Sequence, residues 1–507
     1  MGSNASIAKN SAFLFVRMLI SMGVSFYTSR AILQLLGIED FGIYNLVAGV
    51  IASFSFIANT IISANSRFLS FSIGLNDITQ LKKTFSLCVT SSIITALVLV
   101  IFCETLGLWW IFNKINIPDA KFFEAQIVFH IAVLNLFFTI VFTPFNALII
   151  SFEKMNIYAI VSVVNSLLNL LVVFLLYFNY SGYSNLIMYG ALSLVVNLGI
   201  SGIYYFYSRT KFKVEGFSIC FDKELKKIFT YSSWDIYGNL AVTARTSGVA
   251  ILQNMFFGVV ANAGIGIATQ VQNLVNQFSS NILFASKPQV IKRYASGDID
   301  GMIDVINKTV LFTSVLLSLV VVPLIVEMDS ILIFWLGILP EHTVAFVQWF
   351  LLFIFGANIS QCLLMGIHAT GKVRNSSIIN GTLYLFVIPL SYWAFSKDFA
   401  IEFPYILNFL FILIGGLLNA FYLKREVRKF DVLAFYRNCV LPIIVISVLN
   451  YLLLIGLKSY TGTGFFAIIS TFLFSSCFTA LWIWFFVFDK GIKEKSLNYL
   501  KEKWSKI

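Results

Sequence analysis

Long apolar runs separated by short polar segments are the dominant pattern of the chain. They lie near residues 12–36, 43–72, 85–112, 125–151, 157–178, 186–208, 229–256, 259–285, 309–333, 343–368, 376–395, 403–423, 438–457 and 464–488. A helix needs about 20 mostly apolar residues to cross a hydrocarbon core of roughly 30 Å. Alternating segments of about ten residues, typical of membrane-spanning strands, do not occur in the sequence. The pattern therefore predicts an all-α polytopic membrane protein with 14 transmembrane helices.

The composition agrees with this fold class. Hydrophobic residues make up 59% of the 507 residues and charged residues 12%, and the mean hydropathy is +0.87. An ordinary soluble domain carries roughly 25% charged residues, so a soluble enzyme, a disordered chain and a coiled coil are excluded. The six cysteines stand singly, without a CxxC pair, and indicate neither a disulfide framework nor a metal site.

The distribution of basic residues orients the predicted helices. With the N-terminus inside, 27 Lys and Arg fall in cytoplasmic segments and four fall outside. Such an asymmetry is typical of the positive-inside rule, so we expect both termini in the cytoplasm. The net charge of +11 then reflects orientation and attraction to lipid headgroups, and no nucleic-acid partner is needed to explain it.

The two halves of the chain resemble each other at an offset of about 220 residues. ILQ at 32–34 recurs at 251–253, SIGLNDITQLKK at 72–83 pairs with YASGDIDGMIDV at 294–305, and EKMN at 153–156 pairs with GKVRN at 371–375. We therefore predict two pseudo-symmetric six-helix bundles, residues 1–208 and 228–425, joined by a basic cytoplasmic linker at 209–227. Residues 426–507 supply two extra helices and a basic tail. Parallel repeats of this kind place a substrate path between the halves.

Four arginines lie within the predicted spans: Arg17, Arg30, Arg67 and Arg245. Even a low estimate for a charge at a helix centre is about 2.5–3.5 kcal/mol, so such residues usually face a protein interior or a water-filled cavity. Arginine also presents a planar fork that suits phosphate oxygens. We expect a cationic cavity for an anionic cargo, with snorkelling to the interface as the alternative for Arg30 and Arg67.

Polar residues form stripes on the spans that carry these charges. Asn59 belongs to a stripe on the second span, and Gln270, Asn273, Asn276 and Gln277 lie within two turns of the eighth. These amides predict a lining for water or sugar, although Ser and Asn also join membrane helices by hydrogen bonds.

The sequence predicts two acids within the spans, Glu104 and Asp235. For Asp235 two interpretations stay open. It is either a proton or sodium site coupled to transport or an acid near the inner interface.

Motifs for catalysis are absent from the sequence. GxxxxGK[ST], HExxH and GxSxG do not occur, and no outer connection exceeds about 16 residues. We expect no enzyme, no catalytic or metal-binding residue and no cofactor. A membrane-embedded glycan polymerase or ligase, which needs a long outer loop, is disfavoured for the same reason.

The stretch at 9–50 resembles the start of polysaccharide transporters of the MOP superfamily, the Wzx-type flippases of O-antigen or capsule repeat units. The resemblance rests on Asn10, Arg30, Leu36, Gly37, Phe41, Gly42 and Tyr44, and NALIISFEKMNIYAIVSVVN at 146–165 is similar to that family's junction of spans four and five.

The resemblance implies a flippase in the bacterial cytoplasmic (inner) membrane. Such proteins move undecaprenyl-diphosphate-linked oligosaccharides, the repeat units of O-antigen, capsule or exopolysaccharide, from the cytoplasmic to the periplasmic leaflet by alternating access. It further implies that cationic residues clamp the diphosphate, with membrane lipids, a polymerase and a chain-length protein as partners. A flippase for lipid-linked peptidoglycan precursor is the alternative, and a MATE-like drug/cation antiporter is a weaker one.

Overall fold

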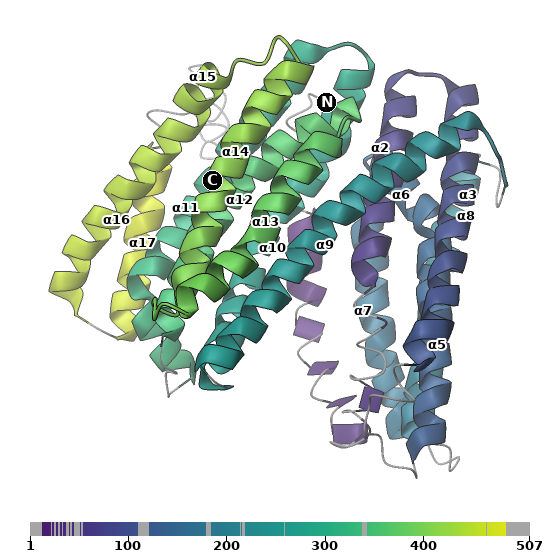
Figure 1. Cartoon of the computed structure of the whole chain (residues 1–507), viewed down its shortest axis with the longest axis horizontal. Coiled ribbons are helices and arrows are strands. Elements are labelled where there is room, and N and C mark those ends of the chain that lie inside the picture. The colour runs from purple at the N-terminus through teal and green to yellow at the C-terminus, as the bar shows by residue number, and fades with distance from the viewer. Residues whose placement is uncertain are drawn as a thin grey trace, which may run out of the picture. The chain divides into compact units, whose positions relative to one another are not determined.

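The computed structural model describes residues 54–109, 121–178, 184–212, 218–257, 259–336, 342–462 and 464–482, together with Val214 and part of the stretch 13–51. Every regular element in these residues is a helix (Figure 1). Ten of the described helices are long and apolar enough to cross a membrane. The all-helical, polytopic membrane fold predicted from the sequence is therefore confirmed. The predicted total of 14 spans and the cytoplasmic termini stay predictions, because both chain ends lie outside the described residues.

The helices of the first half fall in the order that the apolar runs predict. They are α2 (Ser55–Gly74), α3 (Ile78–Phe102, continued by a π-helical turn at Cys103–Gly107), α5 (Phe122–Val141), α6 (Thr143–Ser151), α7 (Met155–Tyr177) and α8 (Asn185–Phe212). Residues 13–21, near the start of the chain, are helical as well.

The second half contains the labelled helices from α9 onward. They are α9 (Lys223–Phe257), α10 (Val259–Ala295), α11 (Ile299–Leu336), α12 (Thr343–Thr370), α13 (Arg374–Phe395), α14 (Phe403–Glu426), the short α15 (Val432–Phe435), α16 (Leu441–Thr461) and α17 (Phe465–Trp482). The helices α2, α9 and α10 are not among the ten apolar spans, and these three carry the predicted polar stripes together with Arg67 and Arg245.

Contacts between Cα atoms divide the chain into two compact units. The first comprises Met1–Leu240, Phe284–Ile303 and Met365–Gly381, and the second Ala241–Leu283, Asp304–Leu364 and Thr382–Ile507. The division runs through α9 to α13, so one end of each of these helices belongs to the first unit and the remainder to the second. The bundle boundaries read from the sequence stay a prediction, because they follow the repeat and not these contacts.

The matched segments of the sequence repeat adopt matching turns. Between α2 and α3, Asn76 has a positive φ of 56° and Asp77 accepts a hydrogen bond from the Gln80 N–H. Between α10 and α11, Gly297 has φ 80° and Asp298 accepts from the Gly301 N–H. In both turns an Asp at the N-cap satisfies a free amide of the following helix.

The second matched pair shows the same correspondence. Glu153 and Gly371 begin the segments EKMN and GKVRN, and both have positive φ, 57° and 77°. A left-handed residue at this place ends one helix and turns the chain into the next. The equivalent turns support the internal repeat that the sequence predicts.

Buried apolar residues and short polar contacts hold each unit together. In the first unit Phe85 and Phe145 pack edge to face at 5.2 Å between ring centroids, within the core of α3, α6 and α8. Asn65 of α2 donates to the hydroxyls of Ser92 and Thr143 at 3.1 and 3.3 Å. Such hydrogen bonds join helices where lipid offers no polar partner.

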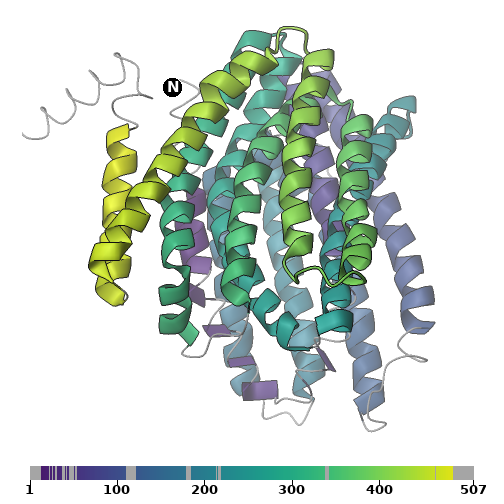
Figure 2. The same ribbon diagram turned by 60° about the vertical axis from the view of Figure 1, so that its left-hand side comes forward.

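The pair α16 and α17 is joined to α11 through a buried carboxylate. These two helices run side by side in both views (Figures 1 and 2). Glu327 of α11 is 0% exposed, accepts from the Thr471 hydroxyl at 3.2 Å, and lies 3.6 Å from Lys458 Nζ. Lys458 also donates to Asp329 at 2.8 Å and to the Val326 carbonyl at 2.6 Å. Counting only Glu104 and Asp235 as span acids was therefore wrong, because Glu327 and Asp329 fall within the predicted span 309–333.

Replacing Lys458 by Met is expected to destabilise the protein, because the Glu327 carboxylate then stays buried without its cation. Removing one partner of a buried ion pair lowers the free energy of unfolding by roughly 3–5 kcal/mol. We expect a loss toward the lower end of this range, because Lys458 is partly exposed. The measurement is the Tm of the solubilised protein, read from intrinsic fluorescence. The control Lys308→Met breaks an exposed pair with Asp304, which is worth about 0–1 kcal/mol. Equal Tm values for the two variants would contradict the account.

Candidate functional site: an arginine-lined cavity

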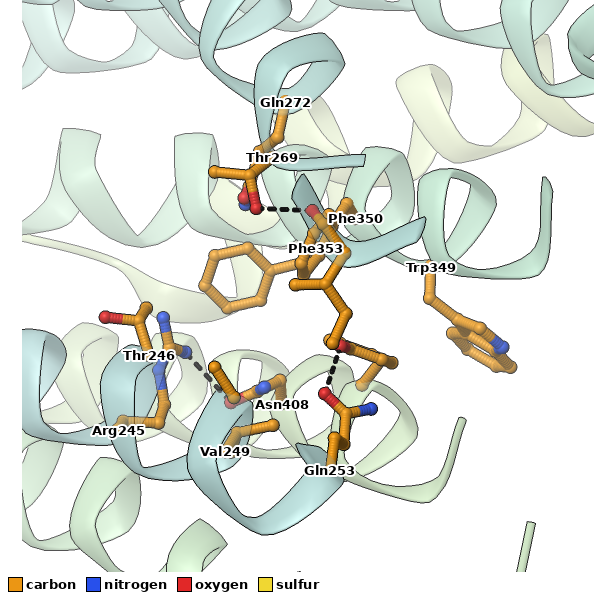
Figure 3. A pocket seen from close by; sticks show the side chains of 13 residues that line it. Arg245, Thr246, Val249, Gln253, Thr269, Gln272, Trp349, Phe350, Phe353 and Asn408 are labelled. Atoms are coloured by element: carbon orange, nitrogen blue, oxygen red, sulfur yellow. Dashed lines mark hydrogen bonds between the residues drawn. The ribbon is translucent and has the colours of Figure 1, made fainter. Parts of the chain in front are cut away.

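Arg245 of α9 lies at a cavity inside the second unit. The residue is 6% exposed, and its guanidinium Nη1 donates to Asn408 Oδ1 of α14 at 2.9 Å, drawn as a dashed line in Figure 3. Its Nε is buried without a hydrogen-bond partner among the described residues. The rings of Tyr384 and Phe353 lie 4.5 and 5.0 Å from Arg245 Cζ. Aromatic faces stabilise a cation without neutralising it, so the arginine keeps an unused donor.

The cavity beside Arg245 has a volume of about 100 Å³. Figure 3 shows Thr269 and Gln272 of α10 on the side opposite Arg245 and Gln253 of α9. Gln253 is held in place, since its amide donates to the Ile401 carbonyl at 3.0 Å and accepts from the Tyr405 hydroxyl at 2.7 Å. The space is large enough for a few water molecules.

The described lining of this cavity carries positive charge and no negative charge. Among the described residues that line the cavity, Arg245 is charged and none is acidic. The other polar members include the hydroxyls and amides of Thr246, Thr269, Gln272, Gln253 and Asn408. The rest of the lining is apolar or aromatic. A buried cation without an acid beside it favours an anion.

Arg67 of α2 is bound in a different way. Its Nε donates to the carbonyl of His368 at 3.2 Å, and Nη2 donates to the carbonyl of Ala369 at 3.4 Å. These carbonyls end α12, where a cation compensates the helix dipole. A Cβ at Gly371 would lie 2.3 Å from Arg67 Nη2, so the glycine leaves room for the guanidinium. A role of Arg67 in binding substrate stays a prediction, and its described contacts fasten α12 to α2.

Further contacts join helices of the first unit at the end where Arg67 binds α12. This end is predicted to face the cytoplasm. Glu153, between α6 and α7, accepts from Lys292 at 2.8 Å and from Gln289 at 3.0 Å, both on α10. Lys287 donates to Ser63 of α2 at 2.7 Å. A Cβ at Gly74 would lie 2.7 Å from the Lys292 carbonyl, which shows how closely α2 and α10 approach here. We call the Glu153–Lys292–Gln289 contacts the inner latch.

The remaining predicted site residues are less closely engaged. Arg17, in the first unit, is partly buried beside an apolar groove, whereas Arg30 lies outside the described residues. Asp235 is partly buried and interacts electrostatically with Lys287. Its coupling role stays a prediction.

The predicted amide lining is largely exposed. The side chains of Asn59, Gln270, Asn273 and Asn276 are exposed, and Gln277 is partly buried. In the middle of a helix such as α10, amides need water or a ligand as hydrogen-bond partners. Their role in lining a substrate path stays a prediction.

Several cavity residues were not singled out from the sequence as site residues. Gln253 follows Arg245 by two helical turns, so the 3.6-residue period offered a signal for it. Asn408 and Tyr405 come from α14, more than 150 positions away, and no local pattern connects them to Arg245. Within the described part of the chain, no three His, Cys, Asp or Glu residues are grouped to hold a metal ion.

A curated relative is similar to the chain, whereas no family model matches it. The relative is the uncharacterized membrane protein EpsK of Bacillus subtilis (strain 168), 23% identical over 322 residues. These residues are 63% of this chain and 63% of EpsK, so the match spans less than two thirds of that relative.

Solved structures show a likeness in fold over most of the chain. A multidrug resistance MATE family transporter of the MOP superfamily, in an outward-facing conformation, superposes with a TM-score of 0.70 at 12% identity, covering 84% of this chain and 97% of that one. A MATE in the bent conformation gives 0.69 at 11%, covering 86% and 97%. A MOP superfamily transporter from Pyrococcus furiosus gives 0.67 at 12%, covering 85% and 96%. The chain is therefore a multi-pass membrane protein with the fold of MOP superfamily transporters.

Proposed function

We propose that this protein is a flippase for undecaprenyl-diphosphate-linked oligosaccharides, moving them from the cytoplasmic to the periplasmic leaflet of the bacterial inner membrane by alternating access. The observation that carries the proposal is Arg245, a buried guanidinium with a free donor in a cavity whose described lining holds no acid. A diphosphate–sugar headgroup cannot cross hydrocarbon unaided, because its charges and hydroxyls lose their hydration there. Arginine replaces water around the phosphates, and the amides of α10 offer partners for sugar hydroxyls.

The polarity of the cavity argues against a cationic cargo. A MATE-like drug/cation antiporter needs negative charge where a cation binds, whereas the described lining here is cationic and neutral. The Pyrococcus furiosus neighbour is described as having a binding pocket of reverse polarity that suggests a different function. The same polarity argument favours an anionic headgroup here. It does not separate an oligosaccharide repeat unit from a peptidoglycan precursor, which stays the alternative because both carry a lipid diphosphate.

Alternating access requires the inner latch to open and close. The side chains of Lys292 and Glu153 are about one-fifth exposed, and Gln289 is 6% exposed. Opening the latch therefore requires water or the cargo to replace these contacts. In our account this latch is closed while the cavity is open to the periplasm, and the cargo is loaded after it opens.

Replacing Arg245 by Ala is expected to lower flipping roughly tenfold to a hundredfold, because a hydrogen bond to a charged group contributes about 1.5–3 kcal/mol. Arg245→Lys keeps the charge without the planar fork and should retain part of the activity. The measurement is translocation of a fluorescent lipid-diphosphate oligosaccharide in proteoliposomes, with Lys308→Ala as the surface control. Flipping by Arg245→Ala at the wild-type rate would contradict the proposal. A wild type that exports cationic drugs and does not flip the lipid-linked oligosaccharide would contradict it as well.

Joining positions 153 and 292 is expected to stop transport. Glu153→Cys and Lys292→Cys, in a background with Cys220 and Cys477 changed to Ser, are linked by a short reducible bis-methanethiosulfonate. Flipping should fall to background and return after reduction.

The matched control links Asp304→Cys to Lys308→Cys, one turn apart on α11, where a bridge constrains nothing but the helix. Transport that continues at the unlinked rate with the 153–292 bridge in place would show that this end does not open.

A further inference from the structure

An apolar groove lies on the first unit between the helical residues 13–20 and the start of α7. Its volume is about 480 Å³, and it is lined by Arg17 and by the apolar side chains of Phe13, Val16, Ile20, Ala159, Ile160, Val163 and Val164. Several of the lining residues are exposed, with exposed fractions of 58% for Val16 and 56% for Ile160. In a membrane helix such exposed apolar walls face lipid chains.

Arg17 gives the groove a charge. Its Nε is buried and has no hydrogen-bond partner among the residues that the structure describes. The ring of Tyr158, whose centroid lies 5.3 Å from Arg17 Cζ, stabilises the cation without neutralising it. A guanidinium beside hydrocarbon walls is complementary to an anion that carries an aliphatic chain.

The groove is held open by its surroundings. The Ser166 hydroxyl of α7 donates to Ser21 at 3.0 Å, which fixes the two helices to each other beyond the groove. Tyr158 is also packed against Phe284, at 5.4 Å between ring centroids. The two walls are therefore positioned independently of any ligand.

The position of the groove along α7 places it in one leaflet. The helix begins at Met155, next to the predicted cytoplasmic connection that contains Lys154, and the lining residues Ala159–Val164 occupy its first three turns. At 1.5 Å per residue they lie roughly 6–14 Å from the cytoplasmic end of α7. One leaflet accounts for about half of a 30 Å hydrocarbon core, so the groove runs from the inner headgroups into the inner chains.

We propose that this groove is the inner-leaflet docking site of a polyprenyl phosphate lipid, with the lipid phosphate on Arg17 and the first isoprene units along α7. The inference rests on the proposed function and adds to it the place where the cargo's lipid end is held before its headgroup reaches the transport path. In this proposal the groove binds the phosphate and the isoprenoid chain of the lipid and makes no contact with the sugar.

The test is binding of undecaprenyl phosphate to the purified full-length protein, read by native mass spectrometry. Arg17→Ala removes the phosphate partner, and Ile160→Trp fills the groove from an exposed position. Each is expected to lower the bound fraction about tenfold or more. The matched control is Leu171→Trp, on the same face of α7 and also exposed, but about 16 Å farther from the cytoplasmic end; it should bind like the wild type.

Binding that survives both groove variants would overturn the proposal, and so would equally tight binding of phosphatidylglycerol to the same site. Proper folding of the variants is checked by their elution as a single species and by an unchanged Tm. The readout is independent of transport. A wild type that binds the lipid phosphate through the groove and does not flip the glycan refutes the proposed function, whereas flipping without groove binding refutes this inference alone.

Discussion

A guanidinium group at membrane depth stays charged, and the protein must surround it with partners that lipid cannot supply. The described arginines meet this constraint in different ways. Arg67 is satisfied by two backbone carbonyls at the end of α12, so its charge strengthens a helix contact. Arg245 and Arg17 each keep a buried Nε that has no hydrogen-bond partner in the described part of the chain. A buried charged group that lacks a hydrogen bond lowers the stability of the protein. An anionic ligand that accepts this hydrogen bond therefore gains the most binding free energy at these two positions.

The free donors have different surroundings, and this difference gives them different roles in our account. Arg245 faces a small cavity whose lining mixes amides and hydroxyls with apolar and aromatic side chains, and in our account it takes the charged headgroup. Arg17 borders an apolar groove, which suits a lipid chain. A lipid-linked glycan combines both chemistries in one molecule. The latch at Glu153 and Lys292 lies at the predicted cytoplasmic end, the side from which such a cargo would be loaded.

Much of the fold could be predicted from the sequence, because a membrane helix is encoded locally by length and apolarity. The polar stripes lie on α2 and α10, which together with α9 are outside the ten apolar spans. The positive φ at both Glu153 and Gly371 agrees with the predicted repeat. Other features depend on packing. The bond of Arg67 to the end of α12 joins residues about 300 positions apart, and Glu327 was overlooked within an apolar run, although its burial against α16 and α17 is what makes it important.

The central claim is that an anionic headgroup binds at Arg245, and a structure of the full-length protein with a bound lipid-diphosphate oligosaccharide tests it most directly. Determined by cryo-electron microscopy, that structure should show a phosphate group within hydrogen-bond distance of Arg245 Nε, with sugar density next to the amides of α10. Phosphate density elsewhere with the Arg245 cavity unchanged, or a cationic compound bound in that cavity, would contradict the account.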